Sequence, residues 1–185
     1  MSKQKERLPP GQHKTDRFPV LQYGGITHVD RSRYKLKIDG LVEKPVALTI
    51  EELKKLPRHD EKVDIHCVTT WTKFDMEWAG VPFKAIVTLV KPKPDARFVI
   101  MHCADGGFTT SLPIEVMMDE DVLVALEYEG KPITDEHGGP VRTIVPKKYF
   151  YKSAKWLVRL EFVKEDQLGY WERGGYSNTA SAGAG

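Results

Sequence analysis

Alternating apolar and polar residues predict most of the regular structure of this chain. Residues 34–38 alternate between apolar and basic side chains and lead into Asp39 and Gly40, which is typical of a half-buried strand followed by a turn. The same alternation over residues 156–163 predicts a second strand of this kind. Further strands are predicted at residues 63–65, 98–103, 122–128 and 141–145.

Two short helices are predicted between these strands. Thr49 offers its hydroxyl as an N-cap and Glu52 completes a capping box, so we expect a helix over residues 49–56 that ends at Pro57. Residues 83–90 follow a proline and place apolar side chains at helical spacing, which predicts the second helix. Because strands dominate and do not alternate regularly with helices, we predict an α+β fold, a β-rich single domain with a mixed or barrel-like sheet.

The chain divides into a folded body and two terminal segments. Residues 1–16 are polar, contain proline and lack periodicity, which predicts a mobile N-terminal arm. Residues 177–185 have the same character and predict a flexible C-terminal tail. The body, residues 17–176, shows no internal repeat or linker, and a chain of 185 residues is long enough for one domain with its own core.

Composition and charge exclude several classes of partner. Apolar residues make up 41% of the chain, but no apolar run approaches the ~20 residues of a membrane span, so we predict no membrane span. The 28 basic and 26 acidic residues are interspersed and give a net charge of +2, which argues against nucleic acid as a partner. The N-terminus lacks the apolar stretch of a secretory signal, so we predict a cytoplasmic protein. In that reducing compartment the two cysteines are expected as free thiols or metal ligands.

The densest cluster of chemically active residues is HCVTTW, residues 66–71. It places Cys67 where a predicted strand ends and a loop begins, a position at which rigid scaffolds often present functional groups. A thiolate is a strongly donating, soft ligand, so Cys67 can hold a metal or serve as a nucleophile. The alternative is that Cys67 is a small buried residue of the core.

Two further interpretations of the cysteines involve histidine. His-Cys pairs at residues 66–67 and 102–103 suggest a zinc site, but neighbouring strand residues point to opposite faces and structural zinc ligands are usually spaced by two or more residues. A nucleophilic cysteine would need a histidine base within hydrogen-bonding distance. Five histidines are candidates for that base: His28, His59, His66, His102 and His137.

A second group of candidate residues surrounds Arg142. His137 and a pair of glycines precede it, and Ser153 and Lys155 follow after a lysine-rich stretch. Paired glycines let a backbone approach a ligand closely, while arginine and lysine supply the charges that suit a phosphate. This composition predicts an anion pocket. The alternative is a solvated charged face made by Lys147, Lys148, Lys152 and Lys155.

Two other clusters have ordinary interpretations. Asp105 and the two glycines after it are consistent with a turn at a strand exit. Tyr170, Trp171 and Tyr176 lie near a second Gly-Gly pair and are interpreted as packing for the C-terminal loop.

Taken in order, six segments resemble the molybdopterin-binding domain of the sulfite oxidase and methionine-sulfoxide reductase superfamily. The resemblance covers residues 17–178, nearly the whole predicted body. The segments are RFPVL (17–21), HCVTTWT (66–72), DGGFTTSLP (105–113), HGGPVR (137–142), PKKYFYKSAKW (146–156) and LGYWE (168–172).

The resemblance implies a cofactor and the residues that hold it. In that family the cysteine of the second segment binds molybdenum, which is also held by molybdopterin, and the matching residue is Cys67. The residues that match those gripping the pterin and its phosphate are His137, Arg142, Ser153, Ala154 and Lys155. Further pterin contacts are implied for Leu21, Gln22, Cys103 and Asp105.

The resemblance also implies a molybdenum-dependent oxidoreductase that moves an oxygen atom to or from a small-molecule substrate. Sulfite is not expected, because sulfite oxidases follow the metal cysteine with a basic pair, whereas here the first basic residue is Lys73. The chain is too short to include the haem or immunoglobulin-like domain of larger members, so we expect a separate electron-transfer partner: a haem protein, a flavoprotein or a quinone-linked subunit. The alternative function is a non-catalytic pterin- and metal-binding module with the same fold.

Overall fold

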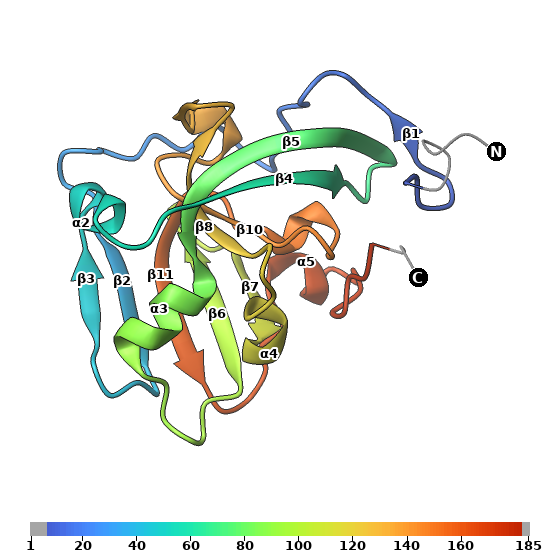
Figure 1. Cartoon of the computed structure of the whole chain (residues 1–185). Helices are drawn as coiled ribbons and strands as arrows, with labels where there is room; N and C mark the ends of the chain where they lie inside the picture. The colour runs from blue at the N-terminus through green and yellow to red at the C-terminus, as the bar shows by residue number, and fades with distance from the viewer. Residues whose placement is uncertain (1–6, 183–185) are drawn as a thin grey trace.

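The computed structural model describes residues 7–182, which fold into two β-sheets with short helices packed around them (Figure 1). The first sheet has the strand order β1-β5-β8-β10, with β4 also pairing with β5 and β9 with β8. Only the β1–β5 pair is parallel among these described strands. The strands are β1 (His13–Lys14), β4 (His59–His66), β5 (Trp71–Pro82), β8 (Leu123–Tyr128), β9 (Lys131–Pro132) and β10 (Arg142–Ile144).

The second sheet has five strands in the order β3-β2-β11-β6-β7. The β2–β11 pair is parallel and the other three pairs are antiparallel. The prediction of a β-rich α+β domain is confirmed, but both sheets have free edges over residues 7–182, so the arrangement is not a closed barrel. The strands are β2 (Leu36–Gly40), β3 (Val46–Leu48), β6 (Phe98–Cys103), β7 (Thr109–Pro113) and β11 (Leu157–Val163).

Both predicted helices are present. The capping box of the first is complete: the Glu52 amide donates to the Thr49 hydroxyl at 3.2 Å, and the Thr49 amide donates to the Glu52 carboxylate at 2.8 Å. No helix between residues 7 and 182 is long and apolar enough to cross a bilayer. The α-helices are α2 (Ile50–Lys54), α3 (Phe83–Val90), α4 (Ile114–Met117) and α5 (Tyr170–Arg173), and the 3₁₀ helices are η1 (Asp135–His137) and η2 (Phe150–Lys152).

The six predicted strands are present, most of them with shifted ends, but β1, β3, β5, β7 and β9 were missing from the prediction. β5 is the longest strand, with 12 residues, and it bends across the top of the molecule in Figure 1. Its buried Phe74, Met76 and Trp78 alternate with charged residues, so the signal of a half-buried strand was present.

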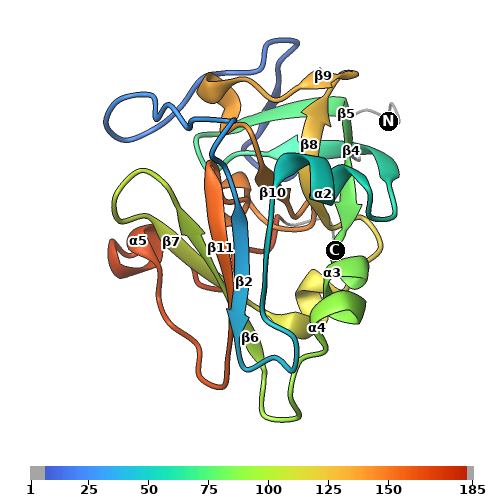
Figure 2. The ribbon, with the colours of Figure 1, turned by 90° about the vertical axis from the view of Figure 1, so that its left-hand side faces the viewer.

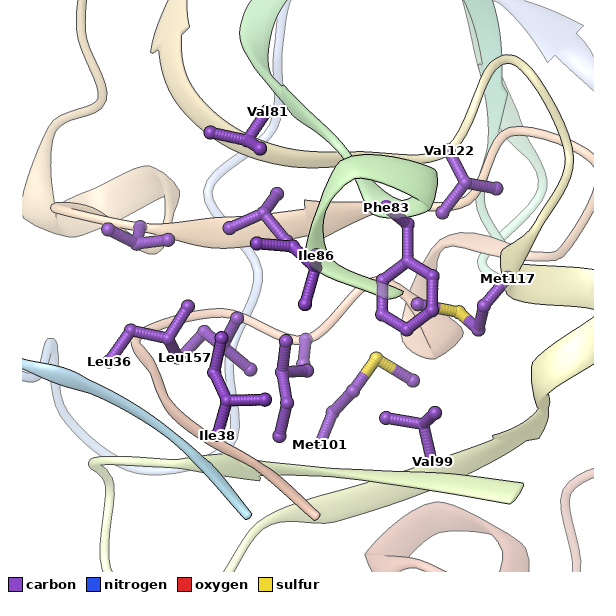
Figure 3. Packing of buried hydrophobic residues seen from close by; sticks show 14 of the residues in the cluster. Leu36, Ile38, Val81, Phe83, Ile86, Val99, Met101, Met117, Val122 and Leu157 are labelled. Atoms are coloured by element: carbon purple, nitrogen blue, oxygen red, sulfur yellow. The ribbon is translucent and has the colours of Figure 1, made fainter. Parts of the chain in front are cut away.

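The interior consists of two apolar clusters. The larger one lies between α3 and the second sheet, where Phe83 and Ile86 of α3 face Met101 of β6 (Figure 3). The smaller one is built on the first sheet around Trp71 and Trp78. Figure 2 shows α3 and α4 at one side of the second sheet and α5 at its other side, beside β7.

The two terminal segments contact the body. Of the predicted arm, residues 1–6 lie outside the described residues, but His13 and Lys14 form β1 beside β5. Of the predicted tail, residues 183–185 lie outside the described part, and Ala180 and Ala182 are buried. The domain boundaries at residues 17 and 176 stay predictions.

Candidate functional site

A cavity of about 300 Å³ lies where the two apolar clusters meet. Its walls come from the loop before β2, the turn between β4 and β5, the turn after β6, and the segments beside β10, η2 and α5. All ten residues implied by the family resemblance line this one cavity: Leu21, Gln22, Cys67, Cys103, Asp105, His137, Arg142, Ser153, Ala154 and Lys155.

Cys67 reaches the cavity from a tight turn that joins β4 to β5. The turn is closed by two backbone hydrogen bonds, from the Cys67 amide to the Trp71 carbonyl at 2.9 Å and from the Thr70 amide to the Cys67 carbonyl at 3.0 Å. Thr70 has a φ of 73°, in the left-handed region that non-glycine residues rarely adopt. The Thr69 hydroxyl donates to the Cys67 sulfur at 3.1 Å. The turn therefore presents a free thiol with one hydrogen-bond donor beside it.

Arg142, the first residue of β10, carries a buried charge with no acidic partner. Its side chain donates to the carbonyls of His137 at 2.7 Å and Ser153 at 3.1 Å, and its guanidinium lies 4.3 Å from the Phe150 ring centre. No carboxylate in the described part of the chain forms an ion pair with it. Burial lowers the pKa of Arg142 to about 9, so the guanidinium stays charged at neutral pH. Such a charge in a cavity wall favours an anionic ligand.

Lys155 supplies a second positive charge to the cavity. Its amine donates to the Leu21 carbonyl and to the side-chain oxygen of Gln22, both at 3.3 Å. These bonds attach the long loop before β2 to the opposite wall. Burial and the Arg142 charge lower the pKa of Lys155 to about 8.

His137 is a neutral group beside these two cations. Its ring is stacked on Phe18, with ring centres 3.8 Å apart and planes 3° apart. Burial, followed by the charges of Arg142 and Lys155, lowers the pKa of His137 to about 4. At neutral pH it therefore offers one ring nitrogen as donor and the other as acceptor.

Ser153 and Ala154 are held against β10 as part of the same wall. The Ser153 hydroxyl accepts a hydrogen bond from the Val145 amide at 3.0 Å, and the Ala154 amide donates to the Thr143 hydroxyl at 2.7 Å. Together with the bond from Arg142 to the Ser153 carbonyl, these contacts make the wall a rigid unit.

Cys103 and Asp105 form the wall on the side of the second sheet. Burial raises the pKa of the Cys103 thiol to about 12, so this second cysteine stays protonated. Asp105 lies in the turn after β6, and its Oδ1 atom is buried without a hydrogen-bond partner among the described residues. Burial also raises the pKa of Asp105. An unsatisfied buried oxygen at this place is suited to a ligand that donates a hydrogen bond.

Two predictions about the anion pocket need correction, and one of the open alternatives is confirmed. The glycines after His137 allow close approach of other parts of the chain and not of a ligand. A Cβ on Gly138 would lie 2.6 Å from the Lys155 side chain. Lys152 is neither solvated nor part of the cavity, because it is fully buried and bonded to Glu172 at 2.6 Å. For Lys147 the solvated alternative is right: its side chain is 62% exposed and pairs with Asp119 at the surface.

Sequence reasoning missed the aromatic part of the cavity. Trp171 and Tyr176 were interpreted as packing for the C-terminal loop, but both line the cavity. The clustering of aromatic residues beside a Gly-Gly pair was the available signal. The other aromatic lining residues are Phe18, Tyr23, Trp71, Phe108, Phe150, Tyr151 and Trp156.

The zinc and cysteine-histidine alternatives find no support in residues 7–182. That part of the chain contains no group of three or more histidine, cysteine or acidic residues placed to hold a metal. His66 is bonded to Thr72 and His102 to Glu161, so neither histidine shares a site with its neighbouring cysteine. No histidine of the described chain forms a hydrogen bond with the Cys67 sulfur, whose partner is Thr69.

One cavity is lined by a free thiol, an unpaired buried guanidinium and an unsatisfied carboxylate oxygen, which are groups chemically suited to an anionic organic ligand and a soft metal. The chain matches the family model for the oxidoreductase molybdopterin-binding domain over residues 23–171. It belongs to this family, of the sulfite-oxidase type, and is a molybdopterin-dependent oxidoreductase whose cofactor is molybdenum with molybdopterin.

Three relatives with similar sequences are bacterial proteins. The chain is 43% identical over 176 residues to the uncharacterized oxidoreductase YuiH of Bacillus subtilis, which covers 95% of this chain and 88% of that protein. It is 32% identical over 163 residues to the putative protein-methionine-sulfoxide reductase subunit YedZ1 of Azospira oryzae, covering 86% of this chain and 62% of that one. With the catalytic subunit MsrP of Campylobacter jejuni the identity is 28%, over 75% of this chain and 52% of MsrP. The matched part of this chain thus spans 88% of YuiH, but only 62% of YedZ1 and 52% of MsrP.

A solved structure shares the fold. The sulfane dehydrogenase SoxCD from Paracoccus pantotrophus matches with a TM-score of 0.70 and 29% identity, over 77% of this chain and 41% of that chain.

Proposed function

We propose that this protein transfers an oxygen atom between water and a small, uncharged substrate, and that it exchanges the accompanying electrons with a separate redox protein. The single observation that carries the proposal is that the free Cys67 thiol and the unpaired Arg142 guanidinium line the same cavity. A thiolate suits the metal, and a desolvated guanidinium suits a phosphate. When bound, the cofactor supplies the two-electron redox change that oxygen-atom transfer requires.

The residues of the cavity have distinct roles in this proposal. Cys67 is the metal ligand, and Arg142 and Lys155 bind the phosphate of the pterin. His137 and Asp105 offer hydrogen-bonding atoms to the polar edges of the pterin. Additional contacts from side chains or backbone are proposed for Leu21, Gln22, Cys103, Ser153 and Ala154.

The residues that line the cavity beside Cys67 favour an uncharged substrate. Val68 and Thr69, the first residues after Cys67, line the cavity, whereas Lys73 does not. Tyr23, which is 67% exposed, and Trp171 also line the cavity, with their ring centres 6.4 Å apart. Because Arg142 and Lys155 are engaged with the cofactor in this proposal, no lining cation is left for an anion such as sulfite.

The electron partner and the location are also proposed. A haem protein, a flavoprotein or a quinone-linked subunit would supply or remove the electrons, in keeping with relatives that are named as subunits. We place the protein in the cytoplasm, where the free thiols of Cys67 and Cys103 would stay reduced. Cell fractionation tests the location.

Metal and pterin analysis of purified protein tests the proposed function. We expect about one molybdenum and one pterin per chain, the pterin being measured by the fluorescence of its released, oxidised form. Cys67→Ser should abolish dye-linked activity and weaken metal binding, because an alkoxide does not replace a thiolate on a soft-ligated metal. Cys103→Ser is the matched control and should have a much smaller effect on the metal. Equal loss in both variants would contradict the assignment of Cys67 as the single protein ligand.

Substrate assays test the proposal that the substrate is uncharged. With a reduced dye as electron donor, dimethyl sulfoxide and trimethylamine N-oxide are suitable uncharged probes, and sulfite with an oxidised dye is the anionic probe. Turnover of sulfite at a higher kcat/KM than either uncharged probe would contradict the proposed substrate class. Bound pterin without turnover of any substrate would instead favour a non-catalytic module.

A further inference from the structure

We infer that Gln12 is a positioning residue that holds the Cys67 turn in the geometry needed for the metal. The inference rests on the proposed role of Cys67 as the metal ligand. Gln12 belongs to the N-terminal segment, more than fifty residues from Cys67 in the chain, and its side-chain amide nitrogen donates to the Cys67 carbonyl at 3.0 Å. The same side chain accepts a hydrogen bond from the Thr72 hydroxyl at 3.1 Å. One amide group therefore joins the two ends of the turn.

The hydrogen-bond directions around Gln12 follow from the groups present. A carbonyl only accepts, so the nitrogen of the Gln12 amide must face Cys67 and its oxygen must face Thr72. The Thr72 hydroxyl has a single proton, which it donates to that oxygen. His66, whose Nδ1 atom lies 2.8 Å from the same hydroxyl, must then be the donor. The chain from His66 through Thr72 and Gln12 to the Cys67 carbonyl has one consistent direction.

The backbone places this amide beside the turn. The His13 amide donates to the Thr70 carbonyl and the Thr15 amide to the Thr72 carbonyl, both at 2.9 Å, and β1 runs parallel to the start of β5. An ion pair from Arg7 to Asp75, at 2.9 Å, attaches the preceding part of the segment to β5. The N-terminal segment, residues 7–15, thus packs along the Cys67 turn and the start of β5 and restrains both.

The turn needs such a restraint because its own contacts are few. Thr70 is in the left-handed region, which is unfavourable for a β-branched residue. At the two ends of the turn, Thr72 is fully buried and His66 nearly so, whereas Thr69 and Thr70 are exposed. Loss of the Gln12 bridge would leave the Cys67 carbonyl with the Thr70 amide as its hydrogen-bond donor and the Thr72 hydroxyl with His66 as its partner. The two ends of the turn would then no longer be joined by one side chain, and the turn could sample other conformations.

Thiol reactivity and metal spectra test the inference in the full-length chain. The variant is Gln12→Leu, which keeps the approximate size of the side chain and removes both hydrogen bonds. The matched control is His13→Ala, which changes the exposed side chain of the next residue, the first of β1. In protein produced without cofactor, alkylation of Cys67 by iodoacetamide is followed by mass spectrometry of the Cys67 peptide. The rate is taken at its high-pH plateau, so that it reports access to the sulfur and not the thiol pKa.

We expect Gln12→Leu to raise the plateau rate by about two- to tenfold, which is the effect of losing the one hydrogen bond that Gln12 donates to the Cys67 carbonyl. His13→Ala should leave the rate unchanged. In protein loaded with cofactor, the sulfur-to-metal charge-transfer absorption should shift in Gln12→Leu and not in the control. If Gln12→Leu does not fold, Gln12→Glu keeps the acceptor for Thr72 but loses the donor to Cys67, and it should shift the same absorption.

An unchanged plateau rate together with an unchanged absorption in a folded Gln12 variant would overturn the inference. Failure of the proposed function has a different signature. If Cys67→Ser retained molybdenum, Cys67 would not be the ligand, whatever the effect of Gln12 on thiol reactivity.

Discussion

Two buried cations lie close together in this protein and differ in their partners. The Lys152 side chain, at the end of η2, has no exposed surface and pairs with Glu172 of α5 at 2.6 Å. Arg142, which is 1% exposed, donates to the carbonyl of Ser153, the next residue after Lys152, but has only carbonyl partners for its side-chain donors. The charge of Lys152 is neutralised by a carboxylate of the protein, whereas the charge of Arg142 has no carboxylate partner among the described residues.

This difference separates a structural charge from a binding charge. Lys152 also donates to the Ser111 carbonyl and to the Asn178 side chain, so it joins β7, η2 and the C-terminal segment in one network. Removing a charge from water is strongly unfavourable unless a partner compensates for it. The protein supplies that partner for Lys152, and for Arg142 we propose that the cofactor phosphate supplies it.

The largest effect on folding is expected from Lys152→Met. The substitution leaves the Glu172 carboxylate buried without its counter-charge, which typically destabilises a protein by about 3 to 5 kcal/mol. Chemical denaturation followed by circular dichroism measures the free energy of unfolding. The double variant Lys152→Met with Glu172→Leu should recover much of the loss, because it removes both charges. No recovery in the double variant would show that the ion pair is not the source of the effect.

Arg142→Met is expected to act mainly on the cofactor. Truncating a buried contact between guanidinium and phosphate typically weakens binding by about 2 to 5 kcal/mol, which is roughly 30-fold or more in affinity. The free energy of unfolding without cofactor should fall by less than in Lys152→Met, since no buried carboxylate loses its partner. Pterin content after dialysis and denaturation of cofactor-free protein give the two quantities. A larger loss of stability than in Lys152→Met would remove the distinction between the two cations.

The charge of Arg142 should also affect the pKa of His137 and, through it, the pH dependence of the free energy of unfolding. The folded-state pKa of His137, about 4, lies below the ordinary value of 6.5, so between these values the unfolded chain binds a proton that the folded chain does not. Stability is therefore expected to fall as the pH decreases from about 6.5 towards 4. In Arg142→Met the His137 pKa should rise part of the way to its ordinary value, because burial persists. Titration by NMR in cofactor-free protein measures it, and an unchanged pKa would contradict an electrostatic effect of Arg142.

The smallest effect is expected from Lys147→Ala. Its ion pair with Asp119 is at the surface, where such pairs contribute about 0 to 1 kcal/mol. Both the free energy of unfolding and the pterin content should stay close to those of the unchanged protein. Pterin loss as large as that of Arg142→Met would place the anion site at the lysine-rich stretch and not beside β10.

Local patterns in the sequence predicted the elements whose stability is local. The capping box of α2 and the proline before α3 depend on residues a few positions apart, and both helices are present. The residues implied by the family resemblance also line one cavity, although their roles as ligands stay proposals. The sequence did not predict which side chains pair with each other in the interior. Nothing near Lys152 in the sequence indicates that Glu172 neutralises its charge.

The sequence by itself determined the β-rich class, the position of Cys67 at a strand exit and the family to which the chain belongs, because alternation, capping and ordered motifs are all read along the chain. Only the tertiary structure decided which lysine is buried and paired, which aromatic rings line the cavity and that Gln12 forms a hydrogen bond with the Cys67 turn. The physical reason is that burial and hydrogen-bond satisfaction depend on contacts between residues far apart in the chain. Those contacts exist only after the two sheets have formed and packed together.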